Sequence, residues 1–237
     1  MNKLLKALLC AGLIFGLVGC GSSGGETEEK KEPENSIKAN SEERKDLVIE
    51  ESGYYLSSPD YPWVSYAVKV TNPNDEYYVA MPQLSVTSYD ANGAVLGTSE
   101  TILQPMEPGQ TIIYSFQADC NQQQPANVEF KIINTSSDYS KVKNSQKAVE
   151  LEASNLNITN DGYYYKLTGN VKNNSGKETT GTSMVFIVFY KEGKIVGGTG
   201  TYLSDMQVDA EMAFDVTTQV VPDYDEIKVY PYAEINA

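Results

Sequence analysis

The chain has 237 residues, of which 18 are Lys or Arg and 32 are Asp or Glu, so its formal net charge is −14. Nucleic-acid binding needs basic surface and anionic lipid repels an acidic chain, so nucleic acid is excluded as a partner and the folded part should stay off a bilayer surface. Histidine is absent, which excludes Ser-His-Asp and Cys-His catalysis as well as histidine-based metal sites.

The chain opens with a short basic segment and an apolar run. Lys3 and Lys6 precede residues 7–18, which are apolar apart from two glycines, and Gly19-Cys20 follows. A membrane-spanning helix needs about 20 apolar residues. The run therefore has the length of a secretory signal core and is too short for a span.

The junction Leu17-Val18-Gly19-Cys20 resembles the lipobox of bacterial lipoproteins. The resemblance implies that residues 1–19 are a signal peptide, and that the thiol of Cys20 carries acyl chains such as palmitate. Each buried CH₂ contributes about 0.8 kcal/mol, so two or three chains hold a domain firmly to a membrane. We expect an extracytoplasmic, lipid-anchored protein on the outer face of a Gram-positive cell membrane. An ordinary signal peptide with an incidental Cys20 is the alternative. Neither Gly21 nor Ser22 is the acidic residue that commonly retains Gram-negative lipoproteins, so sorting stays open.

Residues 20–45 read as the lipidated cysteine and a disordered linker. The segment is rich in Gly and Ser, then in Glu and Lys, and it has no aromatic residue. Such a composition cannot bury enough apolar surface to fold. Flexible-coil scaling gives the linker a reach of roughly 25–30 Å.

Residues 46–134 show a period-two pattern that predicts a first β-sandwich. Val64-Ser65-Tyr66-Ala67-Val68 and Leu84-Ser85-Val86-Thr87 alternate, and turn residues such as Asp90-Ala91-Asn92-Gly93 separate the runs. Pro108-Gly109 suits the centre of a type II turn. Short β-branched and aromatic runs with turn signals between them are typical of a sandwich or barrel.

Residues 135–147 are polar and are expected to form an interdomain linker. Beyond them, residues 148–237 repeat the order of features about 100 residues later. Gly162-Tyr163-Tyr164 matches Gly53-Tyr54-Tyr55, Val171-Lys172-Asn173 matches Val70-Thr71-Asn72, and Gly193 matches Gly93. We therefore expect an all-β chain with two tandem sandwiches.

Two stretches carry a resemblance to the FxLYD-type domains, which are immunoglobulin-like sandwiches of bacterial and archaeal surface proteins. Val86-Thr87-Ser88-Tyr89-Asp90 keeps the Tyr and Asp of the family pattern, and Phe186-Ile187-Val188-Phe189-Tyr190 keeps its Phe and an aromatic in place of Tyr. The resemblance implies two immunoglobulin-like domains and an extracytoplasmic setting. It implies no common reaction and no site residues.

The second copy of the hairpin strand is apolar at every position. An offset of about 100 residues places Met184, Phe186 and Val188 on the inner face. Val185, Ile187 and Phe189 then point outward, and an exposed apolar row marks a contact surface. The hypothesis is a partner or self-association face. The alternative is that the linker, the first module or a loop covers the row.

The remaining candidates are weaker. The 17 tyrosines and Trp63 suit glycan or peptide contact, although strands favour Tyr for packing. The acidic loops at Asp75-Glu76, at Asp205 with Asp209, and at residues 223–226 lack the spacing of a calcium site. Cys120 has no expected disulfide partner, because Cys10 leaves with the signal and Cys20 is acylated. We predict no metal, no cofactor and no catalytic residue.

These observations predict a non-catalytic binding or spacer protein at the bacterial cell surface. The membrane is its partner through the N-terminal lipid, with a protein, peptide or glycan as a further partner. An accessory subunit of a membrane or envelope complex is the second hypothesis. A hydrolase that uses paired carboxylates is the third, since that chemistry needs no histidine.

Overall fold

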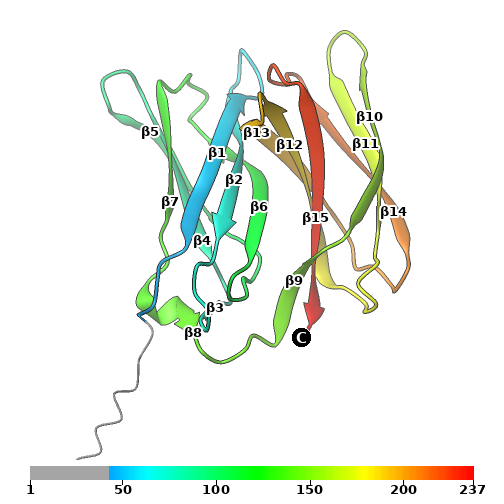
Figure 1. Ribbon diagram of the computed structural model, residues 1–237. Coiled ribbons are helices and arrows are strands. Elements are labelled where there is room, and N and C mark those ends of the chain that lie inside the picture. The colour runs from blue at the N-terminus through cyan, green and yellow to red at the C-terminus, as the bar shows by residue number, and fades with distance from the viewer. Residues whose placement is uncertain (1–42) are drawn as a thin grey trace, which may run out of the picture. The chain divides into compact units, whose positions relative to one another are not determined.

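Figure 1 shows the computed structural model of the chain, which describes residues 43–237. Residues 42–237 form one compact unit. The described part is almost entirely β-structure, with strands β1 to β15 and a single 3-10 helix, η1. The all-β prediction is therefore confirmed. Within residues 43–237, no helix is long and apolar enough to cross a membrane.

Two antiparallel sheets form the first half, which we call the N-terminal sandwich. Strands follow one another in the order β1-β2-β6 in one sheet and β5-β4-β7 in the other. Their bounds are β1 (Val48–Leu56), β2 (Trp63–Thr71), β4 (Gln83–Tyr89), β5 (Val95–Ile102), β6 (Thr111–Asp119) and β7 (Asn127–Ile132).

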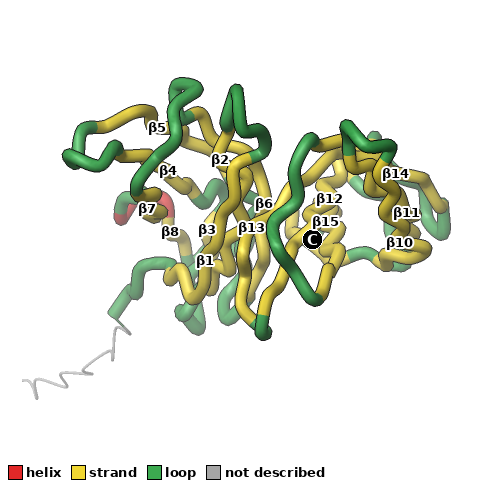
Figure 2. The backbone as a smooth tube through the Cα atoms, turned by 90° about the horizontal axis from the view of Figure 1, so that it is seen from above, coloured by secondary structure: helices red, strands yellow, loops and turns green. Residues whose placement is uncertain are grey.

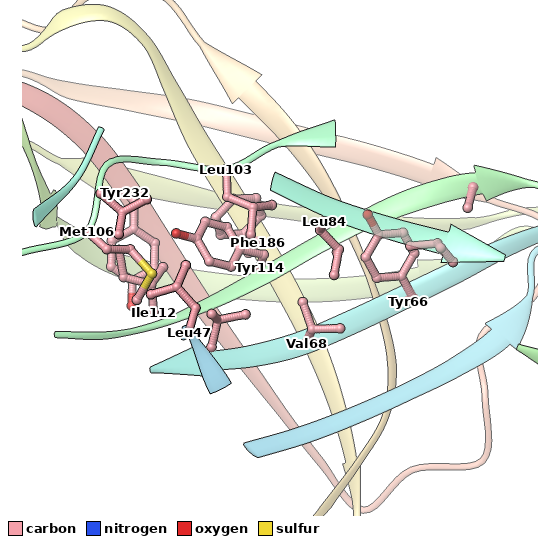
Figure 3. Close-up of a cluster of buried hydrophobic side chains, with 14 of the residues drawn as sticks. Leu47, Tyr66, Val68, Leu84, Leu103, Met106, Ile112, Tyr114, Phe186 and Tyr232 are labelled. Carbon is pink, nitrogen blue, oxygen red and sulfur yellow. The ribbon is translucent and has the colours of Figure 1, made fainter. Parts of the chain in front are cut away.

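The core of this sandwich follows from alternation along the strands. Tyr66 and Val68 of β2, Leu84 of β4 and Tyr114 of β6 are fully buried and meet between the two sheets (Figure 3). Residues between them on the same strands point to the other face of each sheet. Burial of a large apolar side chain contributes about 1.5–3 kcal/mol, so this cluster is a main source of the sandwich's stability.

A second pair of sheets forms the C-terminal sandwich. The strand orders are β10-β11-β14 and β13-β12-β15-β9. Their bounds are β9 (Gln146–Glu150), β10 (Glu152–Asn160), β11 (Tyr165–Lys172), β12 (Thr180–Lys191), β13 (Lys194–Leu203), β14 (Glu211–Thr218) and β15 (Glu226–Asn236).

The expected repeat has a physical counterpart in two buried asparagines. Asn72 follows β2 and Asn173 follows β11, and both are fully buried. The Asn72 side-chain amide donates to Tyr77 O at 2.8 Å, and that of Asn173 donates to Lys177 O at 2.8 Å. Each amide therefore closes the turn after its strand in the same way.

The segments at Gly53 and Gly162, which match in sequence, do not occupy equivalent places in the two halves. Gly53 lies inside β1, opposite Ala67. Gly162 lies in the turn between β10 and β11, where its φ of 95° suits glycine. The residue of β10 in the place of Gly53 is Asn157, opposite Thr168.

The stretch expected to be a linker is partly built into the fold. It contains η1 (Ser136–Asp138) and β8 (Tyr139–Ser140), which pairs with β3 (Tyr78–Val79). Tyr139 is buried, and its hydroxyl accepts a hydrogen bond from the Leu47 N–H at 2.9 Å. β9 then begins at Gln146, two residues before the expected start of the second module.

The end of the expected tether is likewise attached to the fold. The Arg44 guanidinium lies over the Tyr139 ring, 4.5 Å from its centroid. The Lys45 N–H donates to Asn74 Oδ1 at 2.7 Å, and Asn74 Nδ2 donates to Lys45 O at 2.8 Å. Contacts with the N-terminal sandwich therefore begin before Asp46.

The two sandwiches pack face to face, with sheet β1-β2-β6 against sheet β13-β12-β15-β9 (Figures 1 and 2). We call this contact the internal interface. Ala67 and Ile113 on one side pack with Val188, Tyr190 and Ile195 on the other. The strands of the two sandwiches therefore stack as four layers, and each of the two middle sheets packs against another sheet on both of its faces.

Small residues bring the middle sheets close together. Ser115 Oγ donates to the Thr199 carbonyl at 2.9 Å, from one sheet to the backbone of the other. A Cβ at Gly198 would lie 2.3 Å from Ser115 Oγ and 3.0 Å from Ala67 Cβ. A larger residue at these places would force the sheets apart.

Candidate functional site

The predicted contact face is core. Val185, Ile187 and Phe189 are fully buried and pack with Leu167 and Phe214 between the sheets of the C-terminal sandwich. The prediction that this row is an exposed partner face is wrong.

The cause is a hairpin that is one residue shorter in the second half. Ser88 pairs with Gly97 and Tyr89 with Val95, whereas Phe189 pairs with Gly197 and Tyr190 with Ile195. The offset in residue number between corresponding positions of the two halves is therefore one residue larger before this turn than after it. Side chains alternate along a strand, so a slip of one residue exchanges its two faces.

The other face of β12 is buried as well. Phe186 is fully buried, and its ring centroid lies 5.7 Å from that of Tyr114, 5.3 Å from that of Phe116 and 6.0 Å from that of Tyr232. Figure 3 shows Phe186 and Tyr232 beside Tyr114 of the N-terminal sandwich. The alternative that the first module covers an apolar face holds, but for Phe186 and Val188 rather than for the predicted row.

One tyrosine of the N-terminal sandwich enters the core of the other. Tyr55 packs edge-on against Phe189, with ring centroids 5.7 Å apart. Gly197 makes room for it, because a Cβ there would lie 2.6 Å from Tyr55 Cδ1, and its φ of 140° disfavours other residues. Burial raises the pKa of Tyr55, and the nearby Ser65 and Thr218 hydroxyls partly offset that rise.

The Tyr55 hydroxyl is nevertheless unsatisfied. The residue is only 8% exposed, and its hydroxyl makes no hydrogen bond of good geometry. The two nearest hydroxyls also take part in other hydrogen bonds, since Ser65 Oγ accepts from Gln117 Nε2 at 3.1 Å and Thr218 Oγ1 donates to Val220 O at 2.9 Å. A buried donor without a partner costs about 1–3 kcal/mol.

Two hollows open along the internal interface and share Gln117 in their walls. The first has a volume of about 200 Å³. It is lined by Ser57, Ser58, Gln117, Tyr164, Thr218 and Gln219, together with Thr217. The second has a volume of about 280 Å³ and is lined by Phe116, Gln117, Met184, Gly200, Thr201 and Tyr202, together with Ser115. Because Gln117 belongs to both, we treat them as one feature, the interface groove.

The turn between β10 and β11 positions Tyr164 at the groove. The Asp161 carboxylate accepts hydrogen bonds from the Tyr163 and Tyr164 N–H groups at 2.8 Å each. These two donors, that of Tyr164 first, hold the pKa of Asp161 below its usual value. The turn is thereby fixed, with Tyr164 lining the hollow at 46% exposure and Tyr163 outside its lining at 81%.

The other aromatic candidates divide between core and surface. Tyr55 is buried, whereas Tyr61 and Trp63 are exposed. Trp63 opens β2 opposite Asp119, at the strand end next to the β1–β2 loop. The sequence pattern points to these aromatic residues and not to Gln117, whose only signal is its place, with Ser115, on the face of β6 that points away from the N-terminal core.

Cys120 is fully buried. Its Sγ lies 3.0 Å from the Pro62 carbonyl, to which it donates a hydrogen bond. Burial raises the pKa of the thiol, which disfavours the reactive thiolate. The buried position of Cys120 therefore fits a packing role.

Two of the three acidic loops carry an ion pair, Glu76 with Lys141 and Asp223 with Lys191. Asp223 pairs with Lys191 at 3.3 Å, and Asp225 accepts a hydrogen bond from the Glu192 N–H at 2.9 Å. Within residues 43–237, no group of three or more Cys, Asp or Glu side chains is placed to hold a metal ion. The predictions of no metal and no cofactor stay predictions.

The predicted signal peptide and the lipidation site Cys20 lie outside the described residues. Comparison of the chain with protein-family models and with curated proteins finds no match. The lipobox and the FxLYD-type resemblance therefore stay predictions from the sequence.

Proposed function

We propose that the chain is a lipid-anchored, extracytoplasmic protein with a non-catalytic binding or spacer role at the bacterial cell surface. The observation that carries this proposal is the order of a basic start, an apolar run at residues 7–18 and Leu17-Val18-Gly19-Cys20. Acyl chains on one sulfur are enough to keep the chain at a membrane.

The folded part supports a binding or spacer role. The two sandwiches share a buried interface in which Ser115 donates a hydrogen bond to the backbone of the opposite sheet. They therefore form one stiff body rather than two domains that move independently. Such a body, on a linker with a reach of roughly 25–30 Å, presents any surface it carries at a limited distance from the membrane. The accessory-subunit hypothesis loses the surface it relied on, since Val185, Ile187 and Phe189 are buried.

Metabolic labelling with an alkyne-tagged palmitate analogue tests the anchor. The full-length protein, expressed in a Gram-positive host, should incorporate the label, sediment with membranes and lose residues 1–19. Cys20→Ser should abolish labelling and release the protein from the membrane fraction. Cys10→Ser, which alters a residue of the removed segment, is the matched control and should label normally. Equal labelling of the wild type and Cys20→Ser would contradict the proposal.

A further inference from the structure

The interface groove has no charge in its walls. The chain carries 32 acidic and 18 basic residues, yet none of the residues that line the two hollows is charged. A charged ligand would lose its hydration there without gaining a counter-charge, which is costly. The groove therefore suits a neutral ligand.

The groove also offers flat apolar surfaces. Tyr164 lines one hollow and Tyr202, which is 72% exposed, lines the other beside Phe116 and Met184. Aromatic rings provide large apolar contact area with a polar edge. Sugar rings match such walls, because one face of the ring presents C–H groups while the rim carries hydroxyls.

The walls also carry groups that both donate and accept hydrogen bonds. Gln117 and Gln219 supply side-chain amides, and Ser57 and Ser58 supply hydroxyls. A ligand rich in hydroxyl groups matches such walls, because each of its hydroxyls both donates and accepts hydrogen bonds.

We propose that the interface groove binds a neutral oligosaccharide, with Tyr164 and Tyr202 stacking on sugar rings and Gln117 bonding to hydroxyls between them. The site belongs to neither sandwich alone, so it exists only because the two are packed together. About a quarter of the residues of an average polypeptide are charged, so a peptide is matched less well by walls without charge. The inference deepens the binding role proposed above and rests on it, but it does not depend on the lipid anchor.

The test uses the full-length protein in detergent on an array of glycans. Neutral probes are cello-, xylo-, manno-, malto- and chito-oligosaccharides. Charged probes are heparin, hyaluronan and polygalacturonate, and a random peptide library is included. We expect retention of at least one neutral series and of no charged probe. Retention of charged glycans or peptides alone, or of nothing, would overturn the proposal.

Variants then locate the site by calorimetric titration with the retained oligosaccharide. Tyr164→Ala and Gln117→Glu should each weaken binding by about tenfold or more, equivalent to about 1.4 kcal/mol. Tyr61→Ala, which alters an exposed tyrosine outside the groove lining, is the matched control and should change affinity by less than about twofold. Unchanged affinity in both groove variants would overturn the assignment.

Tyr55→Phe is a second control, because the Tyr55 hydroxyl is buried and Tyr55 lines neither hollow. Its affinity for the oligosaccharide should change by less than about twofold. A loss as large as that of Tyr164→Ala would contradict the assignment of the site to the groove. Loss of labelling at Cys20 with intact sugar binding would instead refute only the anchor.

Discussion

Apart from β9, the two sandwiches have the same strand arrangement, but a different sheet of each one faces the internal interface. In the N-terminal sandwich, the sheet that contains β4 is an outer layer, whereas in the C-terminal sandwich the corresponding sheet, with β12, is an inner layer. Ser85 and Thr87 of β4 correspond to Phe186 and Val188 of β12. The same strand position is therefore polar where it meets water and apolar where it meets the other half.

The contact is thus between unlike faces of the repeat. Sheet β1-β2-β6 of the first half meets sheet β13-β12-β15-β9 of the second, which is a head-to-tail arrangement. A head-to-tail contact whose rotation does not close a ring can add further copies. The outermost faces disfavour this, because Thr87 on one end and Lys166 and Asn170 on the other are polar and at least partly exposed. A repeat that stacks in this way needs polar caps.

A buried charge at the internal interface should have the largest effect. Val188→Lys places an ammonium among Ala67 and Ile113, opposite Lys228 of β15. An unpaired buried charge next to a like charge should cost about 4 kcal/mol or more. Thr87→Lys, at the corresponding position of the outer sheet opposite Glu129, should change stability by less than about 0.5 kcal/mol. Urea unfolding of both variants measures the difference, and similar losses would show that the two strands do not correspond as described.

Truncation of the large aromatic side chain at the interface should come next. Phe186→Ala removes a ring that contacts Tyr114, Phe116 and Tyr232. Such a change costs about 3–5 kcal/mol when the site cannot collapse. Ser85→Ala is the matched change in the first half and should be nearly neutral. The free energy of unfolding checks both, and a loss below about 1 kcal/mol for Phe186→Ala would mean that the interface opens readily.

Overpacking tests how closely the sheets approach. Gly198→Ala should lower stability by about 1–3 kcal/mol, because its Cβ would lie 2.3 Å from Ser115 Oγ and 2.7 Å from the Ile187 carbonyl. The usual gain from replacing glycine, about 0.4–1 kcal/mol, is smaller than this penalty. Thr98→Ala, at the corresponding exposed position of β5, should be close to neutral. Thermal unfolding measures both, and a stabilised Gly198→Ala variant would contradict the close approach.

The sequence predicted what local patterning controls. Period-two runs gave the strands, and Gly93 and Gly193 lie in turns with φ values of 81° and 74°. Asn72 and Asn173 mark the same turn in each half. These features depend on residues close together in the chain, so they can be read without knowledge of the packing.

The face assignment and the groove needed information that local patterns do not hold. A hairpin one residue shorter in the second half reversed the faces of β12, and no composition signal reports such a change. The strand itself carried a signal of its burial. Phe186 and Ile187 point to opposite faces and both are apolar, and a strand that is apolar at every position is buried on both faces. The groove joins residues as far apart as Ser57, Gln117 and Gln219, and only the packing of the two sandwiches brings them together.

The smallest expected effect concerns β9, which adds a strand to the second half alone. Glu234 of β15 lies opposite Ala148 of β9, and burial raises its pKa above the ordinary value. A carboxyl whose pKa is raised on folding favours the folded state most at low pH, and this contribution is lost as the pH rises through the ordinary and then the raised pKa. Glu234→Gln should therefore stabilise the protein at pH 7 by less than about 1 kcal/mol, since the group is partly solvated, and the gain should vanish near pH 4. Glu100→Gln, on exposed β5, removes the same charge and is the control. Urea unfolding at both pH values decides the matter: a gain that persists at low pH would mean that Glu234 acts through packing rather than through its charge.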